Sequence, residues 1–171
     1  MKKCLLVLII SIFGFSTMGC NSTNSSVVRI HIRANSNSES DQSVKLIVRD
    51  AVIDYITPLI ADCGDAEDVK NTLSDNLSSI EDIADEVLDQ NGFIYSSNAE
   101  VRNEYFPSRD YGGNTFPADY YDALILELGS GTGDNWWCVA YPPLCFVGEN
   151  ASGNSIKYKS KIVELINKYF G

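Results

Sequence analysis

Apolar and polar residues alternate in the segment 27–33, where valine and isoleucine occupy every second position. This period of two predicts a strand with one face buried. The next five residues, 34–38, are small or polar and favour a turn followed by a helix cap. The folded part of the chain is therefore predicted to begin with a strand that leads into a helix.

The apolar residues then recur at helical spacing. A first apolar stripe runs along residues 40–64 and contains Pro58, so we expect a kink or an early helix end there. A second stripe runs along residues 65–90 and predicts one helix that ends at Asn91-Gly92. Acidic side chains occupy the other face of this second helix, which we interpret as a solvent-exposed face.

Beyond Gly92 the pattern is typical of strands. The segment 93–106 predicts a strand or hairpin, and 120–128 and 136–141 predict two further strands. The glycine-bearing segment 129–135 is interpreted as a hairpin connection, and 156–170 predicts a final helix. The order β-α-α-β-β-β-α predicts an α+β domain, a mainly antiparallel sheet with helices packed on one face.

The first residues have the composition of an export signal. Lys2 and Lys3 precede an apolar stretch, which small residues follow. We predict a signal peptide over 1–19, a polar tether over 20–27 and a single α+β domain over 28–171. The protein is thus expected outside the cytoplasm.

The junction Gly19-Cys20 leaves two alternatives open. A cysteine after a small residue and before a polar run resembles a bacterial lipoprotein junction, at which Cys20 would be lipidated and anchored to a membrane. The other alternative is ordinary signal-peptidase cleavage, with Cys20 incidental.

Charge and composition restrict the possible partners. Loss of Lys2 and Lys3 with the signal changes the net charge from −10 to −12. An acidic chain repels phosphate backbones, so we expect no nucleic-acid partner. The sequence has one histidine and neither CxxC nor HxxxH spacing, so we predict no metal site and no cofactor.

Two cysteines near the end of the predicted sheet allow more than one interpretation. Cys138 and Cys145 flank a segment with two prolines, whose turn would bring them together as a disulfide or as two buried thiols. Cys138 could instead be a nucleophile with His31 as its base, in an exported hydrolase of cell-envelope material.

Polar segments at the predicted strand ends offer a surface for partner recognition. Polar loops and aromatic side chains at such positions commonly bind other proteins. The candidate partner-binding residues are Asn35, Ser36, Asp41, Trp136 and Trp137.

Two sequence blocks resemble the stage II sporulation protein R family. The first, at 29–42, reads Arg-Ile-His-Ile-Arg-Ala-Asn-Ser-Asn-Ser-Glu-Ser-Asp-Gln. The second begins with Tyr-Asp-Ala-Leu-Ile-Leu-Glu-Leu-Gly at 121–129, continues with Gly-Asp-Asn-Trp-Trp-Cys-Val at 133–139 and ends with Tyr-Pro-Pro-Leu-Cys-Phe at 141–146.

The resemblance implies a signalling protein and not an enzyme. Proteins of this family are made in the forespore and exported into the space between forespore and mother cell. There they activate a membrane-embedded aspartic protease, which processes the precursor of the mother-cell sigma factor. We accordingly expect that protease as the partner and no small-molecule substrate.

Overall fold

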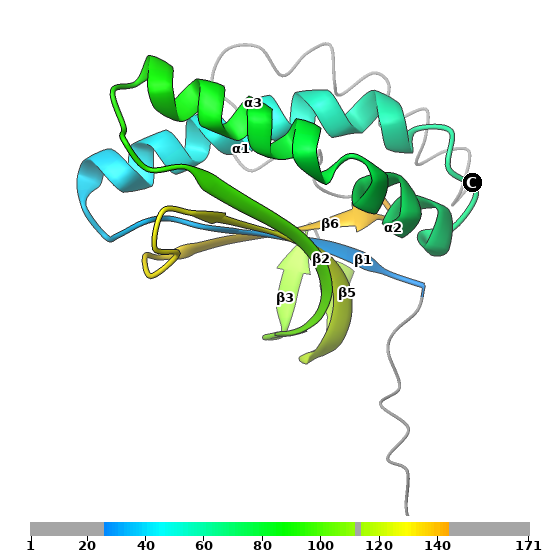
Figure 1. The fold of residues 1–171 in the computed structure, drawn as a ribbon. Coiled ribbons are helices and arrows are strands. Elements are labelled where there is room, and N and C mark those ends of the chain that lie inside the picture. Colours follow the sequence, from blue (N-terminus) through cyan, green and yellow to red (C-terminus); the bar gives the residue numbers. More distant parts are fainter. Residues whose placement is uncertain (1–25, 112–113, 144–171) are drawn as a thin grey trace, which may run out of the picture.

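Helices cover one face of a four-stranded sheet (Figure 1). The structure is a computed structural model that describes residues 26–111 and 114–143. In spatial order the sheet contains β2 (Ser97–Phe106), β5 (Asp119–Leu128), β1 (Val28–Arg33) and β6 (Asn135–Tyr141). The helices are α1 (Glu39–Ile60), α2 (Ala66–Asp75) and α3 (Leu77–Gln90), and a small separate hairpin contains β3 (Arg109–Tyr111) and β4 (Asn114–Phe116). The predicted α+β class is confirmed, and the predicted helix at 156–170 lies outside the described residues.

Strand β1 lies between β5 and β6, and this position decides the topology. It pairs in parallel with β5 and antiparallel with β6, while β2 pairs antiparallel with β5. The segment from β5 to β6 must therefore cross the end of β1. The predicted hairpin connection at 129–135 is wrong, because β1 occupies the place between the two strands.

Local capping fixes the start of α1. The hydroxyl of Ser38 accepts a hydrogen bond from the main-chain N–H of Asp41 at 3.1 Å, which satisfies one of the free donors of the first turn. The helix ends at Ile60, shortly after Pro58. Both ends agree with the sequence pattern.

The predicted single helix over 65–90 is wrong, because it is divided at Asn76. This residue has φ −112° and ψ 13°, outside the helical region. Its side chain accepts a hydrogen bond from the Tyr55 hydroxyl at 2.9 Å and donates one to the carbonyl of Thr72 at 2.8 Å. The break thus depends on a contact with α1, which the continuous apolar stripe could not reveal.

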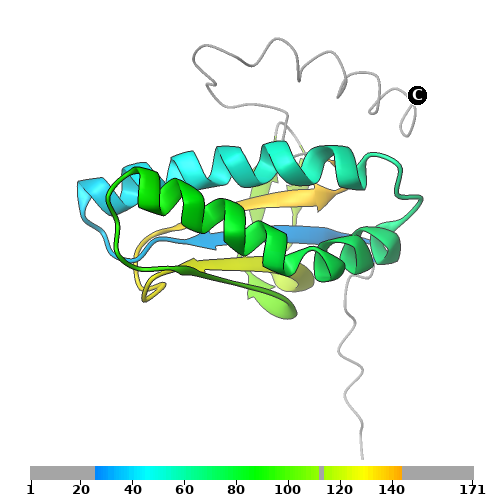
Figure 2. The same ribbon diagram turned by 45° about the horizontal axis from the view of Figure 1, so that its top comes forward.

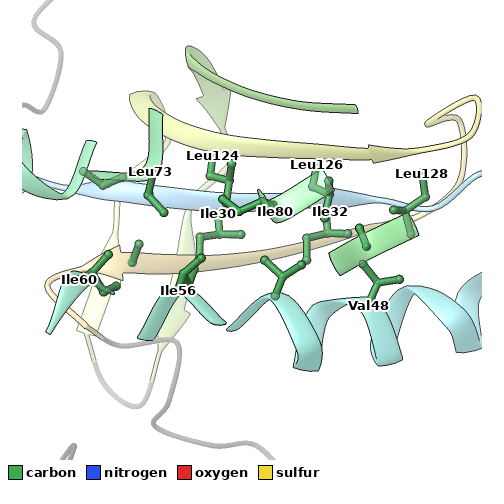
Figure 3. Packing of buried hydrophobic residues seen from close by; sticks show 14 of the residues in the cluster. Ile30, Ile32, Val48, Ile56, Ile60, Leu73, Ile80, Leu124, Leu126 and Leu128 are labelled. Atoms are coloured by element: carbon green, nitrogen blue, oxygen red, sulfur yellow. The ribbon is translucent and has the colours of Figure 1, made fainter. Parts of the chain in front are cut away.

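The main core lies between the helices and the sheet (Figure 3). Alternate residues of β1 and β5 point toward the helices, so one face of each strand is apolar. Complete burial of each such Leu or Ile side chain contributes about 1.5–3 kcal/mol. The labelled members are Ile30, Ile32, Val48, Ile56, Ile60, Leu73, Ile80, Leu124, Leu126 and Leu128.

The other face of the sheet is also partly covered. The far end of the β2–β5 pair curls beneath the sheet, where β3 and β4 also lie (Figure 1). Phe106 and Tyr121 from that end belong to a second apolar cluster. As a result Arg29 is fully buried and His31 is 4% exposed, so β1 is buried on both faces and not on one as predicted.

Candidate functional site

Two segments from the two sequence blocks meet at one end of the sheet. We call residues 34–42 and 129–136 the loop junction; they lie where α1 begins, at the left of Figure 2. The main-chain N–H of Gly133 donates to the carbonyl of Ala34 at 2.8 Å, and that of Asp134 donates to Asn37 Oδ1 at 2.6 Å. The crossing connection is therefore attached directly to the segment that follows β1.

Asn35 supplies most of the contacts between the two loops. Its Oδ1 accepts a hydrogen bond from the main-chain N–H of Ser130 at 2.9 Å. Its carbonyl accepts from the hydroxyls of Ser130 and Thr132, at 2.6 and 2.9 Å. Asn35 thus fixes the conformation of a segment about a hundred residues away in sequence.

Asp41 is the buried acceptor at the centre of the loop junction. It is 6% exposed and accepts hydrogen bonds from Ser36 Oγ at 2.5 Å, Asn35 Nδ2 at 3.1 Å and the Tyr95 hydroxyl at 2.6 Å. Burial alone would raise its pKa, but the hydrogen bonds from Ser36, Tyr95 and Asn35 favour the carboxylate and lower the pKa overall. Burial and the bond to Asp41 raise the pKa of Tyr95, which stays a neutral donor.

A buried lysine connects α1 to the crossing loop. Lys45 is 5% exposed, and its Nζ donates to Gln42 Oε1 at 2.7 Å and to the carbonyl of Asp134 at 2.8 Å. Burial lowers its pKa, and the charge of Asp134 opposes this shift. We did not predict Lys45 or Tyr95 as site residues. The placement of Lys45 in the apolar stripe, next to Val44, is a signal that could have found it.

Two glycines permit the close approach of the loops. A Cβ on Gly133 would overlap the carbonyl of Ser36, and one on Gly129 would overlap the side chain of Asn35. Gly129 also has φ +56°, a left-handed conformation that favours glycine. The two glycines thus allow the two loops to pack closely against each other. A strand and not a helix follows the glycine-bearing segment, so this segment is not a phosphate-binding loop.

The structure separates the two candidate tryptophans. Trp136 packs against the core on the helix side, and the Arg49 guanidinium lies 5.5 Å from the centre of its ring. Trp137 lies on the opposite face, with the Arg109 guanidinium at 4.3 Å and the His31 ring at 5.4 Å. Asn35, Ser36 and Asp41 are thus brought together, whereas the tryptophans do not share one surface.

The alternation of residues also separates the proposed nucleophile from its base. His31 faces Trp137 on the side away from the helices, and its Nδ1 lies 2.5 Å from Glu104 Oε1. Cys138 pairs with Ile30, whose side chain points toward the helices. Because neighbouring residues of a strand point to opposite faces, the sheet lies between the thiol and the imidazole. Burial lowers the pKa of His31, and the bond to Glu104 only partly offsets this.

Some predicted features fall on residues that the structure does not describe. Cys20 and Cys145 are among them, so lipidation and the disulfide with Cys138 stay predictions. Over 26–111 and 114–143, no group of three or more His, Cys, Asp or Glu side chains is arranged to hold a metal ion. In the same ranges no helix has the length and apolar character needed to cross a membrane.

The described part of the chain is thus an α+β domain in which hydrogen bonds hold two loops together at one end of the sheet. A sequence profile of the family described as Stage II sporulation protein R (spore_II_R) matches residues 24–151, and the chain belongs to this family. The predicted family is confirmed, and it gives the chain a role in sporulation.

One relative has the same family name. Stage II sporulation protein R of Bacillus subtilis (strain 168) is 37% identical to this chain over 130 residues. The match covers 76% of this chain and 58% of that protein. No solved structure matches the chain.

Proposed function

We propose that this chain is an exported signal between the forespore and the mother cell during endospore formation. In this proposal it activates a membrane-embedded aspartic protease, and the protease then processes the precursor of the mother-cell sigma factor. Membership of the stage II sporulation protein R family supports the sporulation role. The partner, the location and the step that is activated are parts of the proposal.

The observation that carries the proposal is the loop junction. It joins both sequence blocks into one surface, and the hydrogen bonds that Asn35 and Asp41 accept fix its shape before any partner binds. A preformed surface binds with a smaller loss of conformational entropy than a mobile one. Activation further requires that the protease's active state binds this surface more tightly than its inactive state.

We propose different roles for the candidate residues within this surface. Asn35, Ser36 and Asp41 use their polar atoms inside the loop junction, so we propose that they position the surface. Exposed neighbours such as Ser40 and Asp134 are better placed to touch the protease directly.

An uncleaved signal peptide or a lipid at Cys20 would confine the protein near a membrane. Such confinement raises the effective concentration of a ligand for a membrane-embedded partner without any new contact. The polar tether over 20–27 would leave the folded domain free to reach the protease.

The alternative function, an exported cysteine hydrolase, has less support. His31 and Cys138 lie on opposite faces of the sheet, so the histidine cannot serve as the base for this thiol in the described arrangement. Cys138→Ser should therefore leave sporulation signalling intact. Loss of signalling in Cys138→Ser but not in Cys145→Ser would favour the hydrolase. Equal loss of signalling in both variants would indicate a disulfide.

Reconstitution tests the proposed activation directly. The full chain, the protease in membranes and the sigma-factor precursor are combined, and cleavage of the precursor is measured. Ser40→Arg places a bulky charge on the loop junction and should reduce cleavage at least several-fold. Ser78→Arg is the matched control, because Ser40 and Ser78 are both exposed and both second in their helices. Cleavage that is the same with and without the chain would contradict the proposal.

A further inference from the structure

Strand β2 forms one edge of the sheet, and α3 blocks the beginning of that edge. The main-chain N–H of Ser97 donates to Asp85 Oδ1 at 2.6 Å, and that of Ala99 donates to Glu81 Oε1 at 2.7 Å. Both carboxylates come from the helix that lies over this strand. The first two outward N–H groups are thus unavailable to another strand.

Among residues 26–111 and 114–143, nothing covers the main-chain groups of the next part of the same edge. The β2–β5 pairing runs without a register shift, so the main-chain groups of every second residue continue to face outward. These belong to Val101, Asn103 and Tyr105, and in the described part of the chain no side chain or strand bonds to them. The following outward position is Pro107, which has no N–H. We call residues 101–105 the open edge segment.

Exposed aromatic side chains lie on the open edge segment and on the neighbouring strand β5. Tyr105 is 55% exposed and Tyr120 is 48% exposed, and their rings meet edge to face with centres 5.6 Å apart. Tyrosine is among the residues that contribute most to protein interfaces. The open main-chain groups and this apolar surface therefore belong to one region.

We propose that the open edge segment pairs antiparallel with the same segment of a second copy of this chain. The open segment is symmetric about Asn103, with Ala99 blocked on one side and Pro107 lacking a donor on the other. Pairing centred on Asn103 matches one open segment with the other, and Val101 then lies opposite Tyr105. A shift by one outward position in either direction would oppose open groups to a blocked or absent donor.

Side-chain charge agrees with this register. With Asn103 opposite Asn103, Arg102 of each copy lies opposite Glu104 of the other. Within one copy Arg102 Nη2 already lies 2.8 Å from Glu104 Oε2, so the dimer would extend an existing ion pair into an alternating network. No two like charges would face each other within residues 101–105. A strand of unrelated sequence would not place opposite charges against both Arg102 and Glu104. We therefore assign the edge to a second copy of this chain.

The proposed contact is short, so the dimer should be weak and reversible. Only a five-residue segment of each copy takes part, and such small interfaces are typical of transient association. The proposed self-association goes beyond the proposed activation of a protease, because it uses a different surface from the loop junction. Loss of dimerisation would therefore be measured separately from loss of precursor cleavage.

Two variants at one position test the pairing in the full chain. Asn103→Pro removes the central N–H, and proline is tolerated on an edge whose N–H faces solvent. We expect it to weaken self-association by about tenfold or more in sedimentation equilibrium, because a central strand position needs that donor. Asn103→Ala is the matched control: it keeps the N–H and should associate within about threefold of the natural chain.

Hydrogen exchange of the unchanged chain gives a second readout that needs no variant. The amides of Val101, Asn103 and Tyr105 should exchange more slowly as the protein concentration rises. The amides of Arg102 and Glu104, which face β5, serve as the internal control and should not change with concentration. A chain that stays monomeric at high concentration, association that Asn103→Pro does not weaken, or protection of these amides only by another protein would each overturn the proposal.

Discussion

Substitution of Asp41 by asparagine tests whether the loop junction is held by its buried carboxylate. Asparagine keeps the size of the side chain but replaces one acceptor oxygen with an NH2 group. The Oδ2 atom of Asp41 accepts from both Ser36 and Asn35, and Oδ1 accepts from Tyr95. Whichever way the amide is turned, at least one of these donors loses its partner and the remaining bonds lose the charge.

The expected loss follows from these contacts. A hydrogen bond to a charged group contributes about 1.5–3 kcal/mol, and a buried donor left without a partner costs about 1–3 kcal/mol. We therefore expect Asp41→Asn to lower the free energy of unfolding by about 3 kcal/mol. For a domain of this size that corresponds to a fall in Tm of roughly 6–12 °C. The assay is unfolding by urea and by heat, followed by circular dichroism at neutral pH.

The pH dependence of stability gives a second, independent test of the role of Asp41. The pKa of Asp41 is lower in the folded chain than in the unfolded chain, so the unfolded state takes up the proton first. Its stabilisation is complete above the unfolded pKa of about 3.9 and is lost as the pH falls through the lower folded value. The difference between the natural chain and Asp41→Asn should therefore shrink below about pH 4.

A matched control separates this effect from a general effect of removing negative charge. Asp54→Asn changes an exposed residue of the same helix and should leave the free energy of unfolding within about 0.5 kcal/mol. If Asp41→Asn were equally harmless, or if its effect grew toward acid pH, the assignment of Asp41 as a stabilising carboxylate would be refuted.

Further predictions concern the other buried polar and glycine positions. Arg29→Ala should lower the free energy of unfolding by more than about 2 kcal/mol in urea. It removes a hydrogen bond to the Cys138 carbonyl and the contact of the guanidinium with the Phe106 ring. Limited proteolysis should also detect a loosened β3–β4 hairpin. Gly133→Ala should cost about 2 kcal/mol by overlap with the opposite loop. Gly92→Ala meets open space, so its φ of +81° alone should cost about 1 kcal/mol in the same assay. His31→Gln should flatten the pH dependence of stability. Burial lowers the pKa of His31, so the natural chain loses stability as the pH falls below about 6.5. Urea unfolding between pH 5 and 8 would show this difference.

The sequence pattern could predict the elements whose signals are local. The strand at β1, the apolar stripe of α1 and a helix cap after the turn at 34–38 depend on residues close together in the chain, and the structure confirms them. The division at Asn76 was missed because it depends on a hydrogen bond from Tyr55 in another helix. The β3–β4 hairpin was missed because three-residue strands are too short to show a period.

The candidate site could be predicted only in part for a related reason. Polar residues near a strand end pointed to Asn35, Ser36 and Asp41, and these do lie together. Trp136 and Trp137 are adjacent in sequence, but adjacent residues of a strand face opposite ways, so they could not form one aromatic surface. The same alternation, applied to His31 and Cys138 once their register is known, separates the proposed catalytic pair.

The insertion of β1 between β5 and β6 gives a physical reason why the two sequence blocks contain these residue types. A connection that crosses the end of β1 must pass over the segment that enters α1, with main chain against main chain. Glycine at 129 and 133 permits that approach, and Asn35 satisfies the polar groups that the crossing would otherwise leave without partners. Asp41 and Lys45 then connect the same region to the first helix. These residues are therefore explained by the need to hold the crossing connection in one fixed position against the segment that enters α1.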